Sequence, residues 1–135
     1  MSILDIRQAL ENAVNSISNP IAIAWENVPF TPVSGVPYMQ VYLMRGQPEN
    51  PEMGHGFREV GVLQCNLFYP ITTTGTALAE TKAEQIRAKF PRGASFTKND
   101  TIVTIRYTAE IGRGDRIDGY YMIPIKVFWH SNNFN

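Results

Sequence analysis

Residues 57–93 read FREVGVLQCNLFYPITTTGTALAETKAEQIRAKFPRG. The first part is rich in β-branched and aromatic side chains that alternate, which predicts one long strand. After a Gly/Thr turn, apolar residues recur every three or four positions, which predicts an amphipathic helix with Ala79, Ala83, Ile86 and Phe90 as its buried stripe. A strand this long needs partners along its whole length, because unpaired backbone groups are costly to bury and adhesive when exposed. We therefore expect a chain built for assembly.

Both faces of the long strand are partly apolar. One face is predicted to carry Phe57, Leu63, Cys65, Leu67 and Tyr69. The other face is predicted to carry Arg58, Val60, Val62, Gln64, Asn66 and Phe68. This mixture suits a strand covered by a helix on one side and by a neighbouring element or subunit over part of the other, and a monomeric sandwich would produce it equally.

The remaining chain completes an α+β fold. A first helix starts at Ile3, with its stripe at Ile3, Ile6, Leu10, Val14 and Ile17. In the second helix, Lys82 is predicted to lie on the solvent-exposed face. Strands are predicted at residues 21–25, 38–44, 94–96, 101–111 and 120–130. Long loops, rich in Pro or Gly, are predicted at 26–37, 46–56 and 112–119. We expect one domain, residues 1–135, with a mostly antiparallel sheet and two helices packed on one face.

Composition excludes several classes of protein. Twelve basic residues balance twelve acidic residues, so the chain has no excess positive charge for specific nucleic-acid recognition. No apolar run approaches the roughly 20 residues that a membrane span needs, and we expect no membrane partner. The single cysteine, Cys65, lies among alternating apolar residues and is predicted to be a small buried hydrophobic residue.

The two histidines do not form a recognisable catalytic or metal site. His55 and His130 fall at opposite ends of the predicted β region, without Cys, Asp or Glu at the spacing of metal ligands. His130 is predicted to cap the edge of the sheet. We expect no enzymatic activity, metal or cofactor, and the alternative of another class is a small hydrolase or ligand-binding domain, which would gather one of these histidines with a carboxylate around a pocket.

Two charged loops are the candidate partner-binding surfaces, since charged and polar loops of this length are often functional. The first group of candidate residues is Arg45, Glu49, Glu52, His55 and Arg58. The second group is Arg113, Asp115, Arg116 and Asp118.

Four stretches, in order, cover nearly the whole chain: LDIRQALENAV (4–14), AWENVPFTP (24–32), GQPENPEMGHGFREVGVLQCNLFYP (46–70) and AEQIRAKFPRG (83–93). With these stretches the chain resembles the tail terminator-like proteins, a family of small phage tail proteins. The motifs are structural rather than catalytic.

The resemblance implies an α+β fold in a hexameric ring that caps the tail tube, stops its polymerisation and offers a docking face to the head. The implied partners are further copies of the chain, the phage tail tube protein, and a head-completion or neck protein. The implied location is the tail or neck of the virion, after assembly in the host cytoplasm. A neck or head–tail connector protein is the alternative, because such proteins share related small α+β folds.

Overall fold

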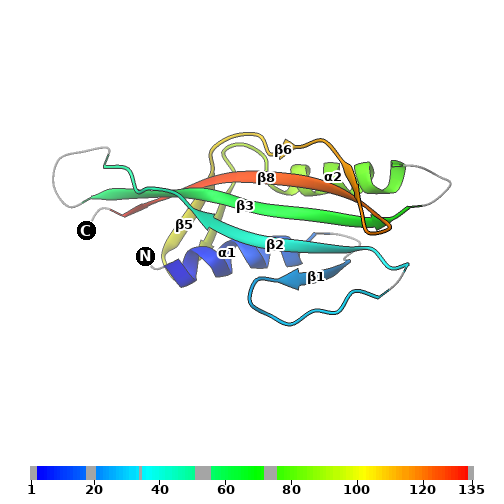
Figure 1. Cartoon of the computed structure of the whole chain (residues 1–135). Helices are drawn as coiled ribbons and strands as arrows, with labels where there is room; N and C mark the ends of the chain where they lie inside the picture. Colours follow the sequence, from blue (N-terminus) through cyan, green and yellow to red (C-terminus); the bar gives the residue numbers. More distant parts are fainter. Residues whose placement is uncertain (1–2, 18–20, 34, 51–55, 72–75, 134–135) are drawn as a thin grey trace.

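The computed structural model describes residues 3–17, 21–33, 35–50, 56–71 and 76–133. Within these ranges the chain forms two helices and a sheet of eight strands (Figure 1). The helices are α1 (Ile3–Asn15) and α2 (Ala77–Lys89). The strands are β1 (Ala22–Trp25), β2 (Tyr38–Arg45), β3 (Phe57–Pro70), β4 (Ser95–Lys98), β5 (Thr101–Ile105), β6 (Glu110–Ile111), β7 (Asp115–Ile117) and β8 (Tyr120–Asn133). The expected α+β class is confirmed.

The centre of the sheet is an antiparallel pair of two 14-residue strands, β3 and β8. Their register runs from Phe57 opposite Asn133 to Pro70 opposite Tyr120. Strand β2 pairs with the other side of β3, and β5, β6 and β7 pair in turn with the other side of β8. On one side β8 pairs with β3 along its whole length, and on the other side β2 pairs with residues 61–68. The pairing of β1 with β2 is parallel, whereas the other pairs are antiparallel.

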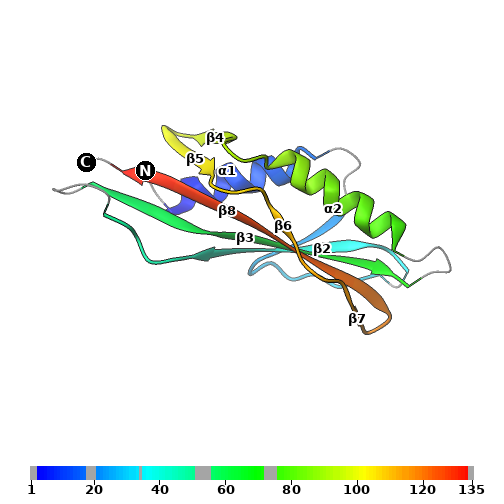
Figure 2. The same cartoon turned by 90° about the horizontal axis from the view of Figure 1, so that it is seen from above.

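Both helices pack on one face of the sheet, which Figure 2 shows from above. This inner face carries alternate residues of β3 and β8. They include Leu63, Cys65, Leu67, Ile123, Ile125, Val127 and Trp129, which are almost completely inaccessible. The helices contribute Leu10 and Ile86 to the same core. The predicted grouping of Leu63, Cys65 and Leu67 on one face of β3 and the predicted burial of Cys65 are confirmed.

Two tight turns fix the register of the short hairpins. Asn99 and Asp100 connect β4 with β5, and Asp118 and Gly119 connect β7 with β8; all four residues have positive φ, between 47° and 81°. Two successive residues with positive φ are the requirement of a type I′ turn, whose twist matches that of paired strands. The expected open loop at 112–119 is therefore wrong in part, since β7 occupies Asp115–Ile117 and only two residues form the turn.

The strand expected at 101–111 is interrupted by a bulge. Residues 106–109 lie opposite only residues 127 and 128, because pairing with β8 stops at Ile105 and resumes at Glu110. The extra residues push Tyr107 out of the ladder, where it is exposed. A second bulge at 112–114 lies opposite residues 123 and 124 of β8, and bulges are among the few places where a sheet accommodates a proline such as Pro124.

The helices differ from expectation at two positions. Lys82 was expected on the solvent-exposed face but is buried. It lies three residues after Ala79 and four before Ile86, so it shares their face of α2. Ile3 is exposed, and the buried stripe of α1 starts one turn later at Ile6, because the end of a helix is surrounded by fewer side chains.

Candidate assembly surfaces

The described part of the first predicted loop extends the β2–β3 hairpin beyond Arg45. Gly46 N donates to Val60 O (2.8 Å), and Glu49 and Arg58 exchange two backbone hydrogen bonds of 2.8 and 2.6 Å. Arg45 lies at the exposed end of β2. The structure therefore brings Arg45, Glu49 and Arg58 to one end of the sheet. Glu52 and His55 lie outside the described residues.

Glu49 holds two arginines together at the base of this tip. Its carboxylate oxygens lie 3.9 Å from Arg58 Nη1 and 3.7 Å from Arg106 Nη1. Arg58 Nε also donates to Asn132 Oδ1 at 2.8 Å, and the Arg106 guanidinium lies 5.6 Å from the centre of the Tyr107 ring. Sequence reasoning missed Arg106, because only the bulge at 106–109 carries it to this end of the sheet. No local sequence signal marks that bulge.

His130 lies beside these charged side chains. It is paired with Val60 on one side and with Thr104 on the other, so it lies inside the sheet and the expected position at the edge is wrong. Burial lowers the pKa of the imidazole, and the neighbouring Arg58 and Arg106 lower it further, against a smaller opposing effect of Glu49. The ring is therefore neutral at neutral pH.

The second predicted loop lies at the opposite end of the sheet. Asp115 and Arg116 are exposed in β7, Asp118 is exposed in the turn, and Arg113 is exposed in the preceding bulge. Asp115 Oδ1 accepts a hydrogen bond from Arg116 N at 2.8 Å. The β3–β8 ladder separates this tip from the first tip by about 40 Å, at roughly 3.4 Å per residue. The two groups of predicted residues thus form two separate surfaces.

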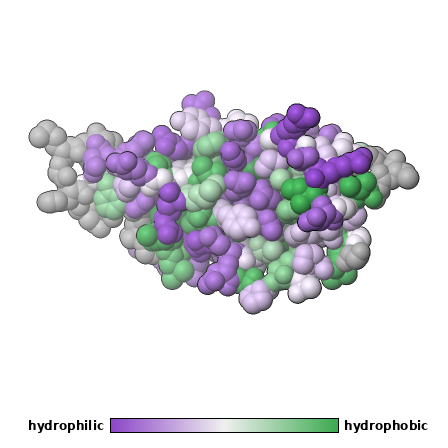
Figure 3. Space-filling view, in the orientation of Figure 1, coloured by the Kyte–Doolittle hydropathy of each residue, from purple (hydrophilic) through white to green (hydrophobic). Residues whose placement is uncertain are grey.

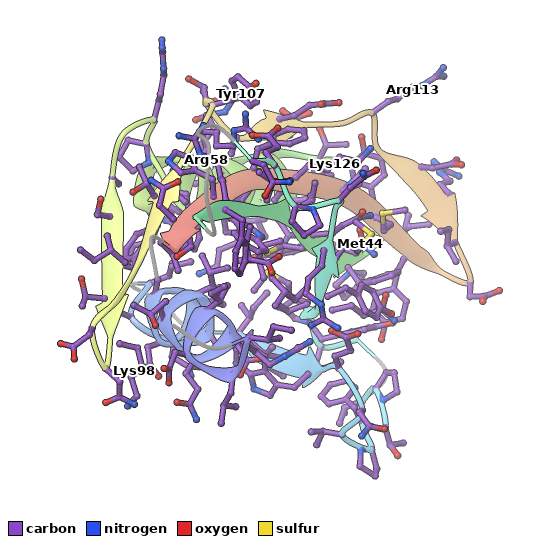
Figure 4. All side chains as sticks on the ribbon, turned by 90° about the vertical axis from the view of Figure 1, so that its left-hand side faces the viewer. Met44, Arg58, Lys98, Tyr107, Arg113 and Lys126 are labelled. Carbon is purple, nitrogen blue, oxygen red and sulfur yellow. The ribbon has the colours of Figure 1, made fainter. Side chains whose placement is uncertain are left out.

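The outer face of the sheet, opposite the helices, is exposed next to the first tip (Figure 3). Nearer the second tip, Tyr38 and Phe68 of this face are buried, and Phe30 from the loop after β1 packs on Tyr38. A row of polar side chains crosses it, with Tyr42, Gln64, Lys126 and Glu110 in register. The next row consists of Met44, Val62 and Phe128. In Figure 4, Arg58, Tyr107 and Lys126 lie on the side of the sheet opposite α1. Polar and apolar rows therefore alternate along this face.

A polar groove of about 620 Å³ lies between α1 and the end of β1. It is lined in part by Arg7, Glu11 and Trp25. Glu26, at its rim, accepts hydrogen bonds from Leu43 N and from Arg7 Nη1, both at 3.0 Å. The pKa of Glu26 is lowered, first by the Leu43 hydrogen bond and then by Arg7. The carboxylate thus protects the part of the β2 edge that β1 leaves unpaired.

Among the described residues, we next consider a reactive thiol, a metal site and a membrane-spanning helix. Cys65 is fully buried on the inner face, and burial raises the pKa of its thiol to about 12, which rules out a reactive thiolate at neutral pH. Within the described ranges, no cluster of three or more His, Cys, Asp or Glu residues is arranged to hold a metal ion. Neither of the described helices is long and apolar enough to cross a membrane.

A family model described as phage tail terminator protein matches residues 5–129, most of the chain. The chain belongs to the phage tail terminator family. It is thus a structural protein of the phage tail and a virion component, as the sequence motifs predicted. None of the curated proteins matches the chain significantly.

Two solved structures share the fold of this tail terminator family member. One chain, 26% identical, superposes with a TM-score of 0.79 and covers 100% of this chain and 98% of its own length. Another, 13% identical, comes from a structure titled as the virion of a native gene transfer agent particle, with a TM-score of 0.69 and 96% of each chain covered. At that identity, the second likeness shows the fold alone.

Proposed function

We propose that this tail terminator acts as one domain, residues 1–135, and forms a closed ring of six copies on the end of the tail tube. The ring stops further addition of tube subunits and provides the surface that the head joins. The family supports this role, and the similar fold within a gene transfer agent virion is consistent with it. We infer no catalytic activity, and we infer assembly in the host cytoplasm before the tail joins the head.

The observation that carries the proposal is the pair of charged tips at opposite ends of one rigid ladder. A protein that ends a tube and also meets the head needs two separate contact surfaces, and the β3–β8 pair holds two about 40 Å apart. Rotational symmetry accounts for the ring, because a tube of repeated subunits presents a pattern that a cyclic partner matches through head-to-tail contacts. The number six comes from the family resemblance.

We assign the tube contact to the first tip, with Arg45, Glu49, Glu52, His55 and Arg58. The second tip, with Arg113, Asp115, Arg116 and Asp118, is assigned to the head-completion or neck protein. The Glu49 cluster supports the first assignment, because it gathers two arginines beside the tip, and arginine is enriched at protein interfaces. Single rim charges set orientation and encounter rate more than affinity, so each tip acts as a unit.

The test is replacement of residues 47–53 by a short Gly/Ser linker. Shortening a surface loop has a small entropic effect on folding, so the variant folds, while purified protein no longer forms rings at tube ends in negative-stain images. The matched control is Asp100→Gly in the β4–β5 turn, where a φ of +65° suits glycine. The control caps tubes like the parent protein.

Two results contradict the proposal. If the loop variant caps tubes and restores infectious particles like the parent protein, the first tip is not the tube contact. If the parent protein decorates the portal and leaves tube ends bare, the chain is a neck or connector protein.

A further inference from the structure

The outer face of the sheet carries an apolar patch next to the first tip. We define the outer apolar patch as Met44, Val62, Phe128 and Tyr107. The first three lie side by side in register, and the Tyr107 and Phe128 rings pack edge to face at 5.7 Å between centroids. Met44 is 44% exposed and Tyr107 is 54% exposed. Methionine and aromatic side chains beside arginine are the composition of protein interfaces rather than of an ordinary solvated surface.

A second exposed apolar segment lies in the loop that follows β1. We define the valine arm as Val28, Val33 and Val36, which are 56%, 64% and 44% exposed. The arm is tied to its own subunit at two points: the Phe30 ring packs on Tyr38 at 5.3 Å, and the Tyr120 hydroxyl donates to Val33 O at 3.2 Å. These ties hold the backbone in place while the valine side chains remain uncovered.

The arm and the patch of one subunit do not cover each other. The arm is anchored at Tyr38, and the patch begins at Met44, six residues along the same strand and therefore about 20 Å away. Among the exposed apolar side chains of the monomer, the arm belongs to a loop and the patch to the face of the sheet, so the two differ in shape. Two different complementary surfaces are what a head-to-tail contact between identical subunits requires.

We propose that the valine arm of one copy packs on the outer apolar patch of the next copy around the ring. This inference rests on the ring proposed above and names its contact. A second copy is the occupant because one repeated contact then covers every arm and every patch in a closed ring. A different protein on the patch would leave the arm exposed. Three prolines of the arm segment, Pro29, Pro32 and Pro37, reduce the entropy that the arm loses on docking.

Single-cysteine variants test the contact directly. The native Cys65 is fully buried and does not interfere. Val33→Cys and Met44→Cys are purified separately, and a short bis-maleimide cross-linker is then added to each variant alone and to their mixture. We expect a cross-linked dimer in the mixture only, because a head-to-tail contact places position 33 of one copy near position 44 of another. The double variant is expected to give a ladder of products. Lys98→Cys mixed with Met44→Cys is the control and stays uncross-linked.

A second measurement does not depend on the efficiency of cross-linking. Val33→Asp places a charge in the arm, and we expect it to raise the concentration needed for assembly about 30-fold, the effect of losing an interface hot spot. At concentrations below those of assembly, its thermal melt stays that of the parent protein, since Val33 is exposed in the monomer.

The outcomes separate this inference from the proposed ring. If sedimentation shows a closed oligomer but positions 33 and 44 do not cross-link and Val33→Asp assembles normally, the ring stands and the contact proposed here is wrong. Cross-linking of Val33→Cys to itself also overturns the contact, since it indicates a two-fold interface. If the parent protein stays monomeric at high concentration and with tubes present, both proposals fall.

Discussion

Gly61 is the position where one added methyl group has the most predictable effect on stability. It lies on the inner face of β3, opposite the fully buried Trp129. A Cβ atom at this position would clash with the carbonyl oxygen of Met44 and would lie 2.6 Å from Trp129 Cζ2. The first obstacle is backbone and the second is an enclosed ring, so neither moves easily.

We expect Gly61→Ala to lower the free energy of unfolding by about 2 kcal/mol. Overpacking costs about 1–3 kcal/mol, and two rigid obstacles place this site near the upper limit. The smaller entropy of the unfolded alanine chain offsets about 0.4–1 kcal/mol. With an unfolding entropy of about 2.1 cal/mol/K per residue over 135 residues, the melting temperature falls by about 7 °C.

The assay is thermal and urea unfolding at matched protein concentration, since association raises apparent stability. The control is Gly46→Ala, where the added Cβ meets the movable Val60 Cγ2 methyl at 3.2 Å; its effect stays below about 1 kcal/mol. A Gly61→Ala protein within about 0.5 kcal/mol of the parent would refute the packing argument, because it would mean that the strand or the Trp129 ring yields at little cost.

The remaining predictions concern titration and thiol reactivity. The pKa of His130 in the folded protein is lowered from its ordinary value of 6.5. As the pH falls, the imidazole is therefore protonated in the unfolded chain before it is protonated in the folded protein. The corresponding stability is present above pH 6.5 and is lost as the pH falls through the lowered pKa. Urea unfolding at pH 7.5 and 5.5 should therefore show a loss of stability that His130→Gln reduces, and an equal loss in both proteins would contradict the assignment. Cys65 should not react with a thiol reagent in the native protein and should react fully after unfolding in urea; rapid native labelling would show that the inner face opens.

The sequence predicted the long strand and which of its residues share a face, because both follow from alternation within one segment. Leu63, Cys65 and Leu67 are buried where the pattern placed them. The fold class followed from the number and order of such segments. These features depend on local periodicity, which a single chain displays directly.

The features that sequence reasoning missed depend on pairing between strands that are distant in the sequence. The bulge at 106–109 is defined only by comparison with residues 127 and 128 of β8. It brings Arg106 to Glu49, so half of the first charged network was not predictable. His130 was expected at an edge because nothing in the sequence shows that β5 pairs with the end of β8. Charge alone marked Arg113 and Asp118 as candidates without showing that they lie far from Arg58.

The β3–β8 ladder also determines how this chain can fold. The nearest paired residues, Pro70 and Tyr120, are 50 positions apart, and each further pair joins residues still more distant in the sequence. The entropy of closing a large loop must therefore be lost before the first central pair forms, after which the ladder can extend one pair at a time. We expect slow folding that begins at the end of the ladder next to the Asp118–Gly119 turn. Until it finishes, both long strands expose adhesive edges, so newly made chains are at risk of aggregation during this interval.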